Sequence, residues 1–333
     1  MKHEERFHIE QILRDVPSGE LSIVRHFASE QGRTLLTDQF SAKTSGKGKM
    51  ETYVLFPGIE ASYNVFLAPQ IAFHHDASDS MLELFHCRSG RVGWNMRGGT
   101  AIYLGTGDMT AHSTACCADS DMMFPLGYAQ GISFSVDLQY LTTDCPDIVR
   151  ETGVDPARLQ RMFCDGNPVA ISACPELERI FASLYSVRSE ILYPYLKLKV
   201  QELLIYLNDF RTDQKSMTQY FSQQTELIKK IHQLLTDHLD QRFTIEELSK
   251  RYLINSSTLK EVFKAVYGLP IASYMKEYRI RQAMKLLRDT DATIAEIAAQ
   301  VGYETQGKFS KAFKDIADML PTEYRKIQHS NNG

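Results

Sequence analysis

The pattern of hydrophobic and polar residues divides the chain into two parts of different character. Between about residues 21 and 137, short apolar or alternating runs follow one another, among them TYVLF, YNVFLA, MLELFHC, AIYL and GISFSV. Turn-forming pairs such as Pro57-Gly58 and Gly98-Gly99 separate these runs. Short strands with turns between them predict a β-barrel or a β-sandwich.

From Pro146 to Phe210 the spacing of apolar residues becomes helical. Residues 176–210 carry apolar side chains three and four positions apart, with Pro194 as the main interruption, so two amphipathic helices are predicted. The stretch RTDQKSMTQYFSQQ, residues 211–224, is polar without an apolar stripe and is interpreted as a linker. Helical periodicity then continues to Ile327.

The C-terminal part contains an internal duplication. TIEELSKRYLINSSTLKEVFKAVYG begins at Thr244, and TIAEIAAQVGYETQGKFSKAFKDIA begins at Thr293. Each copy opens with Thr-x-x-Glu, the capping-box pattern that starts a helix. A short turn follows, for which Gly302 is suited in the second copy, and then a second helix with an inward apolar pair. The pairs are Leu259 with Phe263 and Phe309 with Phe313. Each copy therefore predicts a helix-turn-helix.

The second helix of each copy carries polar residues on its outer face. They are Ser257, Lys260, Glu261 and Lys264 in the first copy, and Gln306, Lys308, Lys311 and Lys314 in the second. One such face would most simply be solvated, but two of them in a capped, duplicated unit favour a surface that binds another molecule. The amphipathic helix IASYMKEYRIRQAMKLLRD between the copies could hold both second helices about one DNA turn (~34 Å) apart.

Composition and charge agree with this division. The 333 residues, 43% hydrophobic and 23% charged, are of ordinary globular composition and predict two or three domains. Residues 225–333 carry 17 Lys and Arg against 14 Asp and Glu, whereas the chain as a whole has a net charge of −4. Local positive charge supports a phosphate-bearing partner. No apolar run is long enough for a membrane span and the N-terminus has no signal-peptide core, so we expect a cytoplasmic protein without membrane contact.

Residues 243–325 resemble the DNA-binding domain of the AraC/XylS transcription regulators, above all in IAEIAAQVGY, KFSKAFK and PTEYR. In that family the second helix of each unit is the recognition helix. The resemblance therefore implies DNA contacts by Ser257, Thr258, Lys260, Glu261, Lys264, Gln306, Gly307, Lys308, Lys311 and Lys314. Leu253 and Asp318 depart from the family, which usually has glycine there. Because Gly307 has no side chain to read a base, the second recognition helix is expected to rely more on lysine–phosphate contacts.

The β-rich front resembles the cupin-like barrel that precedes this domain in many family members, through EL..CRSGRVGWNMRGGTAIYLGTGDM. Metal cupins use two or three histidines and a glutamate. Here Glu83 fits, but His74 and His75 are adjacent, and the later histidine position holds Thr110, with His112 two residues on. That spacing argues against a metal centre. The resemblance implies a small-molecule pocket instead, for which the candidate residues are His74, His75, Glu83, Trp94 and His112.

Two alternative functions remain open at this stage. The histidines and Glu83 allow a metal-dependent cupin enzyme that carries a DNA-binding domain. The six cysteines, which fall between Cys87 and Cys174 and include the neighbours Cys116 and Cys117, allow a DNA alkylation sensor with a methyl-accepting thiol. They lack zinc-binding spacing, however, and are interpreted as free thiols.

Together these features predict an α+β protein in four segments. They are a cupin-like ligand-sensing domain at 1–145, a helical dimerisation or packing segment at 146–210, the linker at 211–224, and a DNA-binding domain of two helix-turn-helix units joined by a helix at 225–333. The predicted function is a ligand-responsive, sequence-specific transcription activator with no catalytic residues and no cofactor. Its expected partners are double-stranded promoter DNA, RNA polymerase, a small-molecule or peptide effector and a second copy of the chain.

Overall fold

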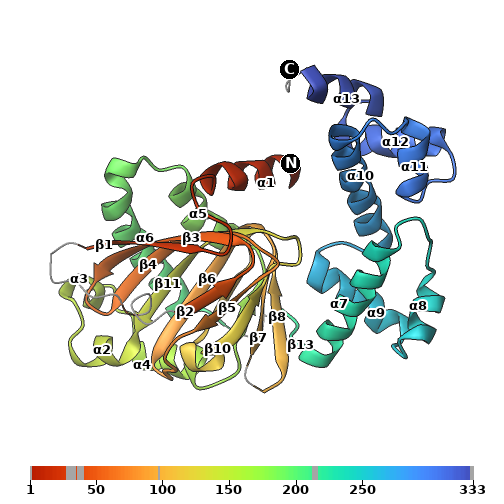
Figure 1. Ribbon diagram of the computed structural model, residues 1–333. Coiled ribbons are helices and arrows are strands. Elements are labelled where there is room, and N and C mark those ends of the chain that lie inside the picture. Colours follow the sequence, from red (N-terminus) through yellow and green to blue (C-terminus); the bar gives the residue numbers. More distant parts are fainter. Residues whose placement is uncertain (1, 28–34, 36–40, 97, 212–216, 331–333) are drawn as a thin grey trace. The chain divides into compact units, whose positions relative to one another are not determined.

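The computed structural model describes residues 2–27, 35, 41–96, 98–211 and 217–330 (Figure 1). The chain divides into two compact units, Met1–Ser222 and Gln223–Gly333. The first unit holds the strands and the second is helical, which confirms the predicted α+β class. Residues 212–216 of the predicted linker lie outside the described residues.

The described strands of the first unit form two sheets. The larger sheet has the order β1-β3-β4-β11-β6-β9-β12 and the smaller sheet the order β13-β8-β7-β10-β5-β2. The larger contains β1 (Leu21–His26), β3 (Lys47–Phe56), β4 (Ile59–Leu67), β6 (Met81–Gly90), β9 (Met109–Ser113), β11 (Ala129–Asp137) and β12 (Val169–Ile171). The smaller contains β2 (Ser41–Thr44), β5 (Gln70–His74), β7 (Val92–Met96), β8 (Thr100–Leu104), β10 (Asp119–Met123) and β13 (Tyr220–Phe221). Among the described strands none pairs with both sheets, so the arrangement is a sandwich and not the closed barrel that the resemblance implied.

The larger sheet buries a different set of side chains on each face, because successive residues of a strand point to opposite sides. Along β11, Ile132 and Phe134 join the core formed with the helices that follow the sheet. The alternate residues Ser133 and Ser135 lie on the opposite face, toward the smaller sheet, where Ser135 bonds Glu83. On that side Phe85 belongs to a second core, which lies between the two sheets.

The helices of the first unit flank the sandwich. They are α1 (Lys2–Ile12), α2 (Leu138–Thr143), α3 (Asp147–Arg150), α4 (Pro156–Leu159), α5 (Pro175–Phe181) and α6 (Ser189–Asp209), with short turns of helix at Thr114–Cys116, Gln160–Cys164 and Ala182–Tyr185. The expected break at Pro194 is wrong, since α6 runs through it and the chain breaks before Ser189. Pro194 is exposed in the second turn of α6, so water can satisfy the carbonyl of Glu190 that loses its helical donor.

The second unit consists of helices in the described residues. They are α7 (Ser222–Asp237), α8 (Ile245–Arg251), α9 (Ser256–Tyr267), α10 (Ile271–Asp289), α11 (Ile294–Gln300), α12 (Gln306–Ala317) and α13 (Pro321–Ser330). The predicted inward residues Leu259, Phe263, Phe309 and Phe313 are all fully buried. No helix in the described part of the chain is long and apolar enough to cross a membrane.

Candidate nucleic-acid interface and ligand cavity

Each helix pair of the second unit begins with a complete capping box. In the first pair, the backbone N–H of Glu247 donates to Thr244 Oγ1 at 3.2 Å, and the backbone N–H of Thr244 donates to Glu247 Oε2 at 2.7 Å. Thr293 and Glu296 repeat both bonds with the same distances in the second pair. The caps satisfy backbone donors that a helix start leaves unpaired, so they fix where α8 and α11 begin.

The turns of the two pairs also share one geometry. After α8, Ile254 N–H donates to the Ser249 carbonyl at 3.1 Å, and after α11, Tyr303 N–H donates to the Ala298 carbonyl at 2.8 Å. This helix end requires a left-handed residue between, and that residue is Leu253 (φ 50°) in one copy and Gly302 (φ 78°) in the other. The duplication seen in the sequence is therefore a duplication of backbone conformation.

Helix α9 exposes most of the residues implied as DNA contacts. The Asn255 side chain caps the helix by accepting from the backbone N–H groups of Ser257 and Thr258. Four of the implied residues are exposed, namely Ser257, Lys260, Glu261 and Lys264, whereas Thr258 is half-buried. The opposite face of α9 is anchored by Val262 and its neighbours in the core. The helix therefore presents a polar face that is held by a rigid apolar one.

Helix α12 also has a buried apolar face and an exposed polar face, but its exposed face carries mainly lysines. Its five implied residues are all exposed, namely Gln306, Gly307, Lys308, Lys311 and Lys314. Lys308 Nζ lies 2.6 Å from Glu304 Oε2. Apart from the neighbouring backbone of α12 itself, no atom of the described residues lies within 4 Å of the place where a Cβ of Gly307 would stand. The first turn of α12 thus offers open backbone, and the lysines supply most of its charge.

An aromatic cluster that the sequence did not reveal packs α7 against α9 and α10. His232 Nε2 lies 2.9 Å from the Tyr274 hydroxyl, and the His232 ring stacks on Tyr267 with centroids 4.3 Å apart. Burial lowers the pKa of His232 to about 4, so the imidazole is neutral near pH 7. The cluster is a packing feature that helps to hold α9 in place.

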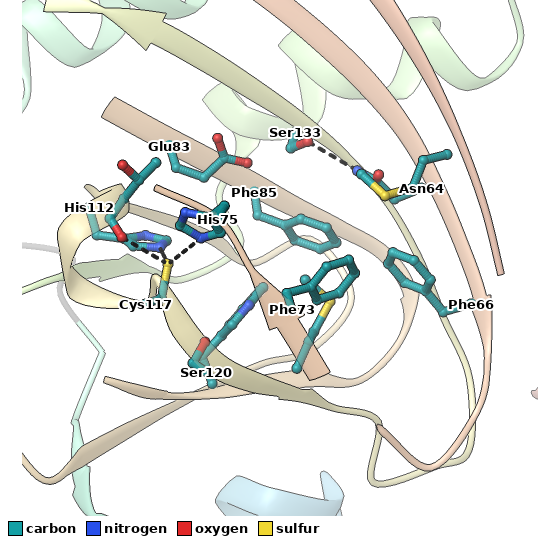
Figure 2. Close-up of a pocket in the computed structure, with 14 residues that line it drawn as sticks. Asn64, Phe66, Phe73, His75, Glu83, Phe85, His112, Cys117, Ser120 and Ser133 are labelled. Carbon is teal, nitrogen blue, oxygen red and sulfur yellow. Dashed lines mark hydrogen bonds between the residues drawn. The ribbon is translucent and has the colours of Figure 1, made fainter. Parts of the chain in front are cut away.

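A cavity of about 60 Å³ lies between the two sheets of the first unit (Figure 2). The larger sheet contributes Asn64 and Glu83 to its lining, and the smaller sheet contributes Phe73 and Trp94. Ser135 Oγ donates to Glu83 Oε2 at 2.6 Å, and burial raises the pKa of Glu83 to about 8. A carboxyl group with that pKa is mostly protonated at pH 7.

A histidine–cysteine group occupies one side of the cavity. His112 Nε2 lies 3.2 Å from Cys117 Sγ, and His75 Nε2 lies 3.9 Å from the same sulfur (Figure 2). Burial lowers the pKa of His112 to about 4 and raises the pKa of the Cys117 thiol, so both groups are neutral near pH 7. A buried neutral thiol is a poor nucleophile, which does not favour the alkylation-sensor alternative.

The structure brings most of the predicted ligand residues together. His75, Glu83, Trp94 and His112 all line the cavity, whereas His74 is exposed and is absent from its lining. Asn64, Ser133 and Cys117 line the cavity and were missed by sequence reasoning. Strand alternation could have placed Asn64 and Ser133 on inward faces, but only the pairing of β4 with β11 shows that they meet. Among the described residues, no group of three or more His, Cys, Asp or Glu side chains is arranged to hold a metal ion.

Comparison with known proteins identifies the C-terminal unit. A family model described as "Helix-turn-helix domain" matches residues 248–327. The HTH-type transcriptional activator RhaR of Mannheimia succiniciproducens is 29% identical over 98 residues, which are 29% of this chain and 36% of that protein. The arabinose operon regulatory protein of Escherichia coli is 31% identical over 99 residues, which are 29% of this chain and 34% of that protein.

Among solved structures, the C-terminal domain of AraT, a response regulator from Geobacillus stearothermophilus, is 29% identical. The match covers 30% of this chain and 84% of that one, with a TM-score of 0.29. The chain spans about a third of the length of the curated relatives it matches, and the matched part is the duplicated helix-turn-helix region. The C-terminal unit of this chain therefore contains a helix-turn-helix domain at residues 248–327, which is similar to part of the arabinose operon regulatory protein.

Proposed function

We propose that this chain is a ligand-responsive transcription regulator that binds promoter DNA through α9 and α12. The observation that carries the proposal is the duplicated pair of capped helices, each with a fully buried inner face and an exposed polar outer face. A surface that only faces solvent does not require the same capped helix pair twice. Two recognition helices that enter successive major grooves do require the pair to be repeated.

The connecting helix α10 supplies a suitable spacing. Its 19 residues extend roughly 28 Å at 1.5 Å per residue, close to one turn of DNA. Its inner face is packed through residues such as Ile280 and Leu287, so α10 can act as a stiff spacer between the recognition helices α9 and α12.

The recognition helices α9 and α12 should contribute differently to DNA binding. On α9, Ser257, Lys260 and Glu261 offer side chains that can bond base edges or phosphates. On α12, Gly307 leaves Lys311 and its neighbouring lysines as the main groups, which favours phosphate contacts over base reading. We infer that α9 provides more of the sequence preference and α12 more of the sequence-independent affinity.

A homodimer is supported by α6. Its exposed large apolar residues Ile191, Leu198 and Ile205 repeat every seven residues, which aligns them along one side of the helix. The same stripe on a second copy could cover them, as in a short coiled coil. An activator role is proposed because the relative RhaR is named as an HTH-type transcriptional activator. Contact with RNA polymerase and action in the cytoplasm are proposed as consequences of that role.

Lysine substitutions on the recognition helices test the proposal. Lys260→Ala and Lys311→Ala should each weaken binding to the DNA upstream of the chain's own coding sequence, by about tenfold, in a gel-shift titration at low salt. The double variant should bind this DNA no better than an unrelated duplex. Lys230→Ala, an exposed lysine on α7, is the matched control and should bind normally. Unchanged affinity in Lys311→Ala would show that α12 does not contact DNA.

A further inference from the structure

The cavity between the two sheets has a polar floor with an ionisable carboxyl group. Glu83 lines it from β6, and the described residues of its lining include neither lysine nor arginine. The imidazole of His112 is neutral near pH 7 because burial lowers its pKa to about 4. An anionic molecule would therefore meet a carboxyl group without an arginine or lysine to balance its charge, which is costly in a buried site.

An unsatisfied acceptor lies on the same floor. Asn64 Nδ2 donates to the Ser62 carbonyl and to Ser133 Oγ, both at 3.1 Å, and the bond to the carbonyl fixes which end of the amide is the nitrogen. Among the described residues Asn64 Oδ1 then has no hydrogen-bond partner, although Asn64 is only 2% exposed. A buried acceptor left without a donor is unfavourable, so a ligand that brings an N–H or O–H group is stabilised there.

Ser133 brings this acceptor close to Glu83. Ser133 Oγ accepts a hydrogen bond from Asn64 Nδ2 and also hydrogen-bonds the Glu83 carboxyl group. Ser135 Oγ bonds the same carboxyl group. The floor therefore offers two neighbouring acceptors from β4 and β6, one neutral and one that can become negative. Burial and the charge of Glu60 keep the Glu83 carboxyl protonated while no cation is near.

Aromatic rings line the cavity beside the polar floor, with Phe66 and Phe85 on the same strands as Asn64 and Glu83, and Phe73 on the smaller sheet (Figure 2). Phe85 and Trp94 meet edge to face with centroids 5.3 Å apart, and Phe66 and Phe73 with centroids 6.2 Å apart. The faces of such rings attract cations as well as alkyl groups. With space for about four to six water-sized groups, the cavity suits a compact molecule.

We propose that the cavity binds a small primary amine in its ammonium form, whose N–H groups donate to Asn64 Oδ1 and to the Glu83 carboxylate while its carbon chain packs against Phe66, Phe85 and Trp94. This inference rests on the proposed function, because it takes the cavity as the site where the effector binds. A neutral alcohol would satisfy Asn64 but would not compensate a charge on Glu83.

Binding of the ammonium ion is coupled to loss of one proton. Glu83 gives its carboxyl proton to solvent and pairs as a carboxylate with the cation, so one proton leaves for each ammonium that binds. Because burial raises the pKa of Glu83 to about 8 in the free chain, affinity should increase about tenfold for each pH unit up to pH 8 and then level off. His75, His112 and Cys117 also face this region, and Glu83→Gln leaves these three side chains in place while it removes the carboxyl group.

Trp94 is the only tryptophan of the chain, so its fluorescence reports the cavity directly. The full chain is titrated with n-butylammonium chloride, 1-butanol and sodium butyrate at constant ionic strength. A saturable change with n-butylammonium alone, tighter at pH 8 than at pH 6.5, supports the proposal. Equal or stronger binding of butyrate overturns it, and this series needs no variant.

Glu83→Gln should weaken n-butylammonium binding by on the order of tenfold to a hundredfold and remove its pH dependence. The matched control is Glu178→Gln, an exposed glutamate of α5 that is not among the described residues lining the cavity, and it should bind normally. Unchanged binding in Glu83→Gln overturns the proposal. DNA binding measured on the same preparations keeps the two ideas apart, since absence of ammonium binding with intact DNA binding overturns only the ligand class.

Discussion

Leu253 carries a backbone strain that a single substitution should relieve. It is 94% exposed and takes φ 50°, the left-handed region that favours glycine. In the second helix-turn-helix the same place is taken by Gly302. Leu253→Gly therefore removes a conformational cost and, because the side chain is almost fully exposed, loses little packing.

The magnitude follows from two opposing terms. A left-handed conformation costs an ordinary L-residue about 1–2 kcal/mol. Glycine lowers this gain in stability by about 0.4–1 kcal/mol, because it increases the conformational entropy of the unfolded chain. We expect Leu253→Gly to increase the free energy of unfolding of the second unit by about 0.5–1 kcal/mol, which corresponds to about 2–6 °C in Tm.

Thermal unfolding of the full chain can assign this gain to the second unit. Circular dichroism at 222 nm reports the helices, most of whose residues lie in the second unit, while the fluorescence of Trp94 reports the first unit. Leu253→Gly should raise the Tm of the second unit's transition in circular dichroism and leave the Tm reported by Trp94 fluorescence unchanged. Leu253→Ala is the control, because alanine removes the leucine side chain but keeps the left-handed cost. A Leu253→Gly protein no more stable than Leu253→Ala would refute the reasoning.

Three further substitutions test other parts of the structure. Gly302→Ala should destabilise the second unit by roughly 2–5 kcal/mol, since a Cβ there would lie 2.1 Å from the Leu239 carbonyl oxygen at φ 78°; a stable variant by circular dichroism would contradict this. Burial raises the pKa of Glu83 from 4.5 to about 8, so the folded chain keeps a proton that the unfolded chain releases, and the stability of the first unit should fall between pH 4.5 and pH 8. Glu83→Gln should match the unmodified chain near pH 4.5 and exceed its urea midpoint above pH 8, as followed by Trp94 fluorescence, and an identical pH dependence in both would count against the assignment. Leu198→Glu should turn the proposed dimer into a monomer in sedimentation velocity, with Leu253→Glu as the control; a Leu198→Glu dimer would exclude the α6 stripe as the interface.

The helical half was the more predictable from sequence because its signals are local. Capping boxes, inward pairs and the turn glycine each depend on residues within one or two helical turns, and the boxes at Thr244 and Thr293 formed as predicted. The departures at Leu253 and Asp318 were visible as well, and both residues take positive φ. Their strain could not be read without the backbone.

The sandwich was less predictable because its pairing is non-local. The individual runs of β3, β4, β6, β8 and β11 were recognisable, but their distribution over two sheets was not. The cavity shows the same limit. Glu83 and Trp94 could be suspected one by one, whereas Asn64 becomes part of the site only through Ser133 of a neighbouring strand.

Binding to DNA tests the central claim most directly. Fluorescence anisotropy of a labelled duplex from upstream of the chain's own coding sequence is compared with a scrambled duplex of equal length, at several salt concentrations. We expect the upstream duplex to bind more tightly by about 1000-fold or more, and its affinity to fall steeply and linearly on a log–log plot as salt rises. Equal and weak binding of both duplexes at every salt concentration would contradict the assignment of α9 and α12 as recognition helices.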